Sequence, residues 1–150
     1  MEDKPVKVML VEDNPADARL VRELLKEAPG SEFDVAHLEF LAEVIERLKA
    51  ETFDIIVLDL RLPDSSGLET FTRVRDQAPE TPVVVLTGLA DEGLGTNAVA
   101  EGAQDYLVKG QVDATSLARS IRYALGVRPT KYRMAVNRGP IEPLGQSEPS

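Results

Sequence analysis

Five side chains with chemically useful groups stand where short apolar segments of the sequence end. Glu12 and Asp13 follow the segment VKVMLV, and Asp59 closes the segment IIVLD. Thr87 closes VVVLT, and Lys109 follows YLV. Asp59 is the most unusual of these residues, because it lies among apolar neighbours and a buried carboxylate is costly unless it is paired, protonated or metal-bound. Its charge therefore needs a partner.

These residue types together fit the chemistry of a divalent cation and a phosphoryl group. Three carboxylates in one crevice repel each other without a counter-ion, and Mg²⁺ commonly takes one or two carboxylates, several waters and a phosphate oxygen. Lys109 would add a positive charge and Thr87 a hydroxyl donor beside a phosphoryl group on Asp59. Each residue alone has a simpler explanation, since helix caps and solvated surfaces use the same residue types. The combination favours the functional interpretation.

Short strands and amphipathic helices alternate along the chain. Strands are predicted where Val, Ile and Leu cluster between turn residues, at Val6–Val11, Phe33–Leu38, Ile55–Asp59, Val83–Thr87 and Tyr106–Val108. Helices are predicted at residues 15–28, 40–50, 67–77, 92–101 and 113–125. Asn14-Pro15 is a typical helix start. The first helix is predicted to bury a stripe made of Leu20, Val21, Leu24, Leu25 and Ala28.

This alternation predicts an α/β fold, a (βα)5 doubly wound five-stranded parallel sheet. Strands that are apolar throughout and joined by helices are typical of a parallel sheet covered on both faces. We expect the flavodoxin-like strand order 2-1-3-4-5, in which ligands bind at the carboxyl ends of the strands. All five polar residues fall at that end, so the sequence predicts a single site there.

Composition and charge exclude several classes of protein. A chain of 150 residues suits one domain with a real core. Its net charge of −9 disfavours direct nucleic-acid binding, and the absence of Cys rules out disulfides and thiolate chemistry. The apolar segments are too short to span a membrane, and the N-terminus lacks a secretory signal, so we expect a cytoplasmic protein that does not contact a membrane.

At these motifs the chain resembles the receiver domain of bacterial two-component response regulators, over about residues 6–125. The acidic pair lies in VEDN, the hydroxyl in VVVLTG and the lysine in DYLVKG. The block LDLRLPDSSG is similar to the family's Asp-x-x-Met-Pro-x-x-x-Gly, with Leu62 in place of Met. The resemblance is to a stand-alone receiver of the chemotaxis type.

The resemblance implies a phosphoacceptor and a magnesium site. Asp59 would accept a phosphoryl group from the phosphohistidine of a histidine kinase or phosphotransfer protein. Asp13, Asp59 and the backbone carbonyl of Arg61 would hold Mg²⁺, and Glu12 would contribute through water.

The resemblance also implies residues that respond to the phosphoryl group. Lys109 and Thr87 would bind its oxygens, and Tyr106 would be the switch aromatic, although an amphipathic residue at the sheet edge is the alternative. Arg61 and Leu89 lie two positions after Asp59 and Thr87 and would tune the lifetime of the phosphoryl group. Slow dephosphorylation is the hypothesis, because Leu89 offers no polar group to orient a water.

Three features depart from the pattern or stand outside it. The family usually has Lys-Pro with a cis bond, whereas here Gly110 follows Lys109; a non-proline cis bond costs ~2.5–4 kcal/mol, so we expect a trans or altered loop. The predicted fourth helix contains the weak helix formers Gly93, Gly95 and Asn97, which suits an element that shifts, although a weak surface helix is the alternative. His37 is the only histidine, and we expect a strand-edge residue there and not a phosphotransfer group.

The expected function is that of a single-domain response regulator that is not itself an enzyme. Residues 1–125 would form the receiver and residues 126–150 a flexible Pro/Gly-rich tail. The first helix would dock the kinase, and the fourth helix, fifth strand and fifth helix would contact an unknown downstream protein. Alternatives are a phosphorylation-independent binding module and the excised receiver of a longer regulator. An aspartyl-phosphate phosphatase lacks its second acid here, because Arg61 occupies that position, and no GTPase P-loop motif is present.

Overall fold

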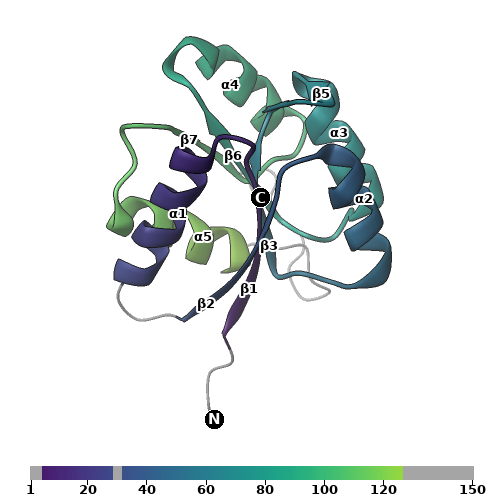
Figure 1. Cartoon of the computed structure of the whole chain (residues 1–150). Helices are drawn as coiled ribbons and strands as arrows, with labels where there is room; N and C mark the ends of the chain where they lie inside the picture. The colour runs from purple at the N-terminus through teal and green to yellow at the C-terminus, as the bar shows by residue number, and fades with distance from the viewer. Residues whose placement is uncertain (1–4, 29–31, 127–150) are drawn as a thin grey trace, which may run out of the picture.

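The computed structural model describes residues 5–28 and 32–126 (Figure 1). The predicted tail from residue 127 onward lies outside the described residues. The main strands are β1 (Val6–Val11), β2 (Phe33–Leu38), β3 (Ile55–Asp59), β6 (Val83–Thr87) and β7 (Asp105–Val108). The helices are α1 (Pro15–Glu27), α2 (Leu41–Ala50), α3 (Leu68–Gln77), α4 (Glu92–Ala100) and α5 (Ala114–Gly126). Every predicted helix and strand is present, with ends within a residue or two of those expected.

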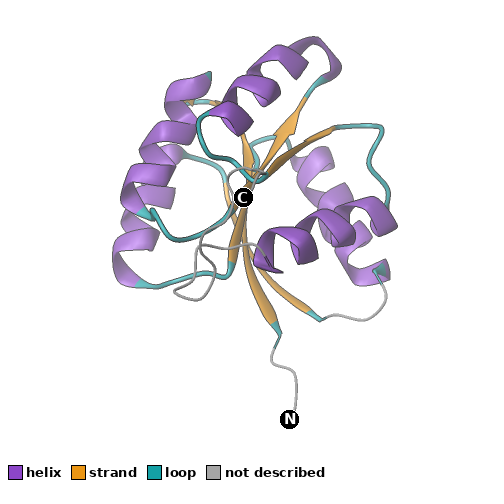
Figure 2. Ribbon diagram, turned by 180° about the vertical axis from the view of Figure 1, so that it is seen from behind, coloured by secondary structure: helices purple, strands orange, loops and turns teal. Residues whose placement is uncertain are grey.

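The five main strands form one parallel sheet in the order β2-β1-β3-β6-β7. In chain order of these strands this is 2-1-3-4-5, so the predicted α/β fold and strand order are confirmed. The sheet runs between two groups of helices, which Figures 1 and 2 show from opposite sides. Because β3 has a hydrogen-bonded neighbour on each side, its last residue, Asp59, sits near the middle of the sheet's carboxyl edge.

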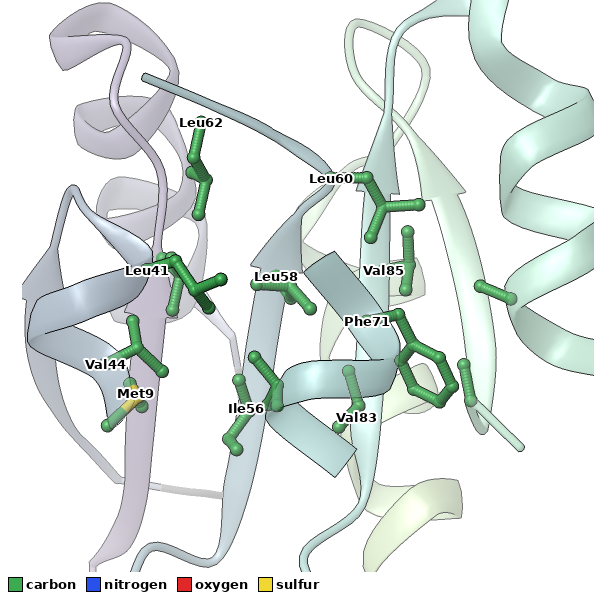
Figure 3. Packing of buried hydrophobic residues seen from close by; sticks show 14 of the residues in the cluster. Met9, Leu41, Val44, Ile56, Leu58, Leu60, Leu62, Phe71, Val83 and Val85 are labelled. Carbon is green, nitrogen blue, oxygen red and sulfur yellow. The ribbon is translucent and has the colours of Figure 1, made fainter. Parts of the chain in front are cut away.

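The core lies in two clusters, one on each face of the sheet. Helices α1 and α5 cover one face, and α2, α3 and α4 cover the other. Figure 3 shows the second cluster, where Ile56 and Leu58 of β3 pack among side chains of α2 and α3 such as Leu41 and Phe71. One prediction here is wrong: Leu20 is 45% exposed and does not belong to the buried stripe of α1. No helix within the described residues is long and apolar enough to cross a membrane.

The loop after β3 contains a small hairpin that the sequence did not predict. Its strands β4 (Arg61–Leu62) and β5 (Ser65–Ser66) pair antiparallel. At its tip, the Asp64 carboxylate accepts hydrogen bonds from the backbone N–H groups of Leu41 (2.8 Å) and Ala42 (3.0 Å). These bonds cap the N-terminus of α2, which has no side-chain cap of its own. The same contact holds the loop that follows Asp59 against α2.

Candidate functional site

The carboxyl ends of β1, β3 and β7 bring an acidic cluster and a lysine together. The Lys109 Nζ lies 2.8 Å from Glu12 Oε1 and 3.0 Å from Asp59 Oδ2. These residues are far apart in the sequence, and they meet because parallel strands end at the same edge of the sheet. The structure therefore places Glu12, Asp59 and Lys109 in one site, as the sequence predicted.

Asp59 is rigidly held and only slightly exposed. The residue is 6% exposed and closes a strand whose other residues are completely buried. Its Oδ1 accepts a hydrogen bond from the backbone N–H of Arg61 at 3.0 Å, and its Oδ2 accepts one from Lys109. Charge-assisted bonds of this kind offset the cost of burying the carboxylate.

Three carboxylates of the site have the arrangement and chemistry of a hard-cation site. One carboxylate oxygen from each of Glu12, Asp13 and Asp59 lies within 4.8 Å of the others. Glu12 is completely buried, whereas Asp13 is half-buried. Oxygen ligands of this type suit Mg²⁺, and a cation would also reduce the repulsion among the three carboxylates. The donor set therefore fits the ion that the sequence predicted.

Burial and crowding shift the proton affinities in the site. Burial raises the pKa of Glu12 to about 7, and the neighbouring Asp59 adds to the rise while Lys109 partly offsets it. Burial lowers the pKa of Lys109, but hydrogen bonds and attraction from Glu12 and Asp59 outweigh it and leave this pKa above its ordinary value. Lys109 therefore stays positively charged at neutral pH.

A third carboxylate, which the sequence analysis missed, contacts the lysine beside Glu12 and Asp59. Asp17 Oδ2 lies 3.1 Å from Lys109 Nζ. Asp17 is in the first turn of α1, where its backbone N–H bonds the side chain of the cap residue Asn14. A first-turn Asp is commonly explained by the helix dipole alone. The sequence feature that could have identified Asp17 as a site residue is its position, because the first turn of α1 directly follows the acidic pair Glu12–Asp13.

Thr87 and Tyr106 lie on adjacent strands. Among the described residues, neither side chain hydrogen-bonds to Glu12, Asp59 or Lys109. Thr87 is 2% exposed, and its Oγ1 has no hydrogen-bond partner among the described residues. Tyr106 is half-buried, and its hydroxyl lies 3.5 Å from Glu92 Oε1 of α4. Its ring packs so closely on Gly95 that a Cβ built there would lie 2.7 Å from two ring atoms. A buried hydroxyl without a partner is unusual and marks a position suited to bonding a ligand.

Arg61 and Leu89 lie at the surface on loops beside Asp59 and Thr87. The Arg61 guanidinium pairs with both oxygens of Asp91, at 2.6 Å from Nε and 2.8 Å from Nη2. This pair connects the loop after β3 to the 3-10 helix η1 (Leu89–Asp91), which leads into α4. Leu89 is 65% exposed. Asp91 was not singled out from the sequence, because its partner lies thirty residues away in the chain.

The turn after β7 forms without a cis bond. No cis peptide occurs in the described residues, so the Lys109–Gly110 bond is trans. Gly110 has φ of +88°, a backbone angle that side chains of other residues rarely tolerate. The Lys109 backbone N–H donates to the Thr87 carbonyl at 2.8 Å, which continues the pairing of β6 with β7 as far as the lysine.

Residues 8–122 match the response regulator receiver domain family, and the chain therefore belongs to this family. Receiver domains are typically phosphoacceptors without enzymatic activity of their own, bind Mg²⁺ at an acidic pocket and interact with histidine kinases or phosphotransfer proteins. The fold, the acidic cluster and the lysine described above agree with this assignment.

Relatives and solved structures give the same classification. The response regulator protein PilR of Pseudomonas aeruginosa is 32% identical over 146 residues, and the alignment covers 95% of this chain but 31% of PilR. The phosphorylated cyanobacterial phytochrome response regulator RcpA is 26% identical with a TM-score of 0.63, covering 83% of this chain and 91% of RcpA. The receiver domain of a sensor histidine kinase of Pseudomonas aeruginosa PAO1, solved with a magnesium ion in its active-site cleft, has a TM-score of 0.69 at 24% identity, covering 82% and 99% of the two chains.

Proposed function

We propose that this chain is a response regulator whose Asp59 accepts a phosphoryl group from a histidine kinase or phosphotransfer protein. An Asp59 carboxylate oxygen would form a bond to phosphorus while the bond from phosphorus to the donor's imidazole nitrogen breaks, and the imidazole keeps the electron pair. The observation that carries the proposal is the near-complete burial of a carboxylate held by Lys109 beside two further acids. The similar regulator RcpA was solved in a phosphorylated form.

The proposal assigns the magnesium site to Asp13, Asp59 and the backbone carbonyl of Arg61, with Glu12 contributing through water. When bound, Mg²⁺ neutralises negative charge that develops as the phosphoryl group is transferred. Lys109 supplies the second positive charge, since its ammonium already lies 3.0 Å from Asp59 Oδ2. The Glu12–Asp13–Asp59 cluster supports this assignment.

Signal output is proposed to begin at Thr87 and to reach the surface through α4. The buried Thr87 hydroxyl, which has no partner among the described residues, would donate to a phosphoryl oxygen. Tyr106, on the adjacent strand and packed on α4, would respond as the switch aromatic. Arg61 and Leu89, on the loops at the surface, would tune the lifetime of the phosphoryl group.

The proposed partners dock on two different faces. The kinase or phosphotransfer protein would use α1, where Leu20 is 45% exposed. An unknown downstream protein would use α4, β7 and α5, where Val99 and Tyr123 are exposed at 39% and 63%. We propose a cytoplasmic, single-domain regulator that signals by protein contact; because this sequence covers only 31% of PilR, a receiver within a longer regulator is the alternative.

The test is the intact mass of the protein after incubation with acetyl phosphate and MgCl₂. Wild type should gain one phosphoryl adduct, and chelation of Mg²⁺ by EDTA should abolish it. Asp59→Asn should take no adduct, whereas the control Asp76→Asn, at an exposed position on α3, should behave as wild type. An adduct that persists in Asp59→Asn contradicts the assigned acceptor. The absence of any adduct in wild type with two different phosphodonors would favour the binding-module alternative.

A further inference from the structure

The single histidine of the chain makes a specific contact with the acidic site. His37 is half-buried near the end of β2, opposite Leu10 of β1. Its Nε2 lies 2.7 Å from the backbone carbonyl oxygen of Glu12. Because a carbonyl oxygen can only accept, Nε2 must carry the proton and donate it in this bond. His37 is therefore a hydrogen-bond donor to the backbone of the acidic pair.

The contact occurs where regular pairing between β1 and β2 comes to an end. The Glu12 backbone N–H still donates to the Leu38 carbonyl at 3.0 Å, as in a continuing parallel ladder. β2 ends at Leu38, and the His37 ring supplies the donor that a further backbone N–H would supply in a longer strand. Both backbone groups of Glu12 are thus bonded to β2.

The Glu12 carbonyl belongs to the peptide group that joins Glu12 to Asp13. Fixing this carbonyl fixes the plane of that peptide, and hence the position of the Asp13 N and Cα atoms from which its side chain projects. Residues that orient the ligands of a metal without touching it commonly affect metal affinity. The geometry points to His37 as a positioning residue: we propose that its bond to the Glu12 carbonyl holds Glu12 and Asp13 in the arrangement that binds Mg²⁺. This inference rests on the proposed magnesium site.

The test measures Mg²⁺ binding directly, by isothermal titration calorimetry of the full chain with MgCl₂. His37→Leu removes the donor and keeps an apolar side chain of similar bulk. His37→Gln keeps an N–H donor at a similar reach. The control Val35→Ala lies two residues earlier on the same strand, and it removes packing from the core cluster on the face of the sheet that α1 and α5 cover. The free energy of unfolding in EDTA is measured for every variant.

We expect His37→Leu to weaken Mg²⁺ binding by roughly three- to tenfold, which corresponds to the loss of one hydrogen bond. His37→Gln should recover most of the affinity. Val35→Ala should lose stability in EDTA and still bind Mg²⁺ within about twofold of wild type. If His37→Leu does not fold without metal, His37→Asn, whose amide is too short to reach the carbonyl, takes its place with the same expected weakening.

Two results overturn the inference, and they are distinct from failure of the proposed function. Unchanged Mg²⁺ affinity in the folded His37 variants shows that the bond does not position the site. Equal weakening in Val35→Ala shows that the effect is one of general stability. In both cases wild type binds Mg²⁺ and the proposed magnesium site stands. A wild type that binds no Mg²⁺ refutes the magnesium site itself, together with the role given to His37.

Discussion

Four carboxylates gather at the carboxyl edge of the sheet, and three of them contact the same ammonium group. Glu12, Asp17 and Asp59 each lie within 3.1 Å of Lys109 Nζ, and Asp13 lies in the same cluster. One positive charge cannot neutralise so many acids. The pKa of Glu12 is raised mainly by burial, and the neighbouring Asp59 carboxylate raises it further. Without a metal, the carboxylates of the site therefore repel one another, and binding of a proton or a cation reduces this repulsion.

Stability without metal should depend on pH through Glu12. The folded chain holds a proton on Glu12 up to a pKa of about 7, whereas the unfolded chain releases it near the ordinary glutamate pKa of 4.5. Because the native state binds more protons in this window, the free energy of unfolding falls as pH rises from about 4.5 to about 7. The contribution is about 1–3 kcal/mol. Urea unfolding in EDTA at a series of pH values measures it.

Glu12→Gln is the matched variant for this measurement, because it keeps the shape of the side chain and cannot ionise. As the pH rises from about 4.5 to about 7, the free energy of unfolding of Glu12→Gln should increase steadily relative to that of wild type. A constant difference between the two proteins across the window would show that Glu12 does not titrate there.

The sequence predicted the site residues that lie at the ends of strands, and it missed Asp17 and Asp91, which lie beyond the strand ends. Asp59 and Lys109 directly end or follow strands, so the carboxyl-edge rule for parallel sheets brings them together without further information. Asp17 is a turn further along the chain, in a helix, where an acid has an ordinary explanation. The pairing of Asp91 with Arg61 needs the relative position of two loops, which local patterns do not give.

At the scale of elements, the contact between α4 and β7 explains one of two glycines in a weak helix. A Cβ at Gly95 would lie 2.7 Å from the Cγ and Cδ1 atoms of Tyr106, whereas one at Gly93 would meet nothing within 4 Å. Gly95 is therefore required by packing, and it lets α4 approach β7 closely. Gly93 serves no such purpose.

Alanine should therefore have opposite effects at these two positions. Gly93→Ala should raise the free energy of unfolding by up to about 1 kcal/mol, because Ala is the better helix former and the space is open. Gly95→Ala should lower it by about 1–3 kcal/mol, because the near end of the Tyr106 side chain cannot easily move away. Urea unfolding followed by far-UV circular dichroism compares the two variants with wild type.

The double variant Gly95→Ala/Tyr106→Ala isolates the clash. Once the ring is gone, only the Cβ of residue 106, at 3.1 Å, remains close to the added methyl group, so most of the cost of Gly95→Ala should disappear relative to Tyr106→Ala alone. Destabilisation of equal size with and without the ring would place the cause in another contact of Gly95.

Prediction of the elements succeeded where a whole segment carries one pattern. β3 and β6 are apolar throughout because both faces of the sheet are covered, and their bounds were predicted to the residue. The hairpin of β4 and β5 has two residues in each strand, too few for any periodicity to show. Leu20 was assigned to the buried stripe of α1 on spacing alone, but the structure leaves it exposed.

At the scale of the whole molecule, the described residues form a complete two-faced core. Both clusters of buried side chains are built from residues between Val8 and Ala124, and the family match ends at residue 122. The boundary predicted from sequence, near residue 125, was chosen because periodicity stops there, and it stays a prediction.

A chain ending at Gly126 should fold as well as the full chain. We expect its free energy of unfolding to agree with that of the full chain within about 0.5 kcal/mol. A chain ending before α5 should not fold, because it loses Leu117, Ile121 and Ala124 from the core. A clear loss of stability in the chain ending at Gly126 would show that later residues contribute to the domain.

The position of β3 determines which parts of the molecule are free to move. It is paired on both sides, and its side chains enter both clusters. We therefore expect its backbone amides to exchange with solvent only when most of the fold opens. The segment after Thr87, in contrast, forms the short 3-10 helix η1 at the surface. The ion pair between Arg61 and Asp91 links this helix to the loop after β3. We therefore expect Asp59 to stay in place when its side chain is chemically changed, and the surrounding loops to move toward it.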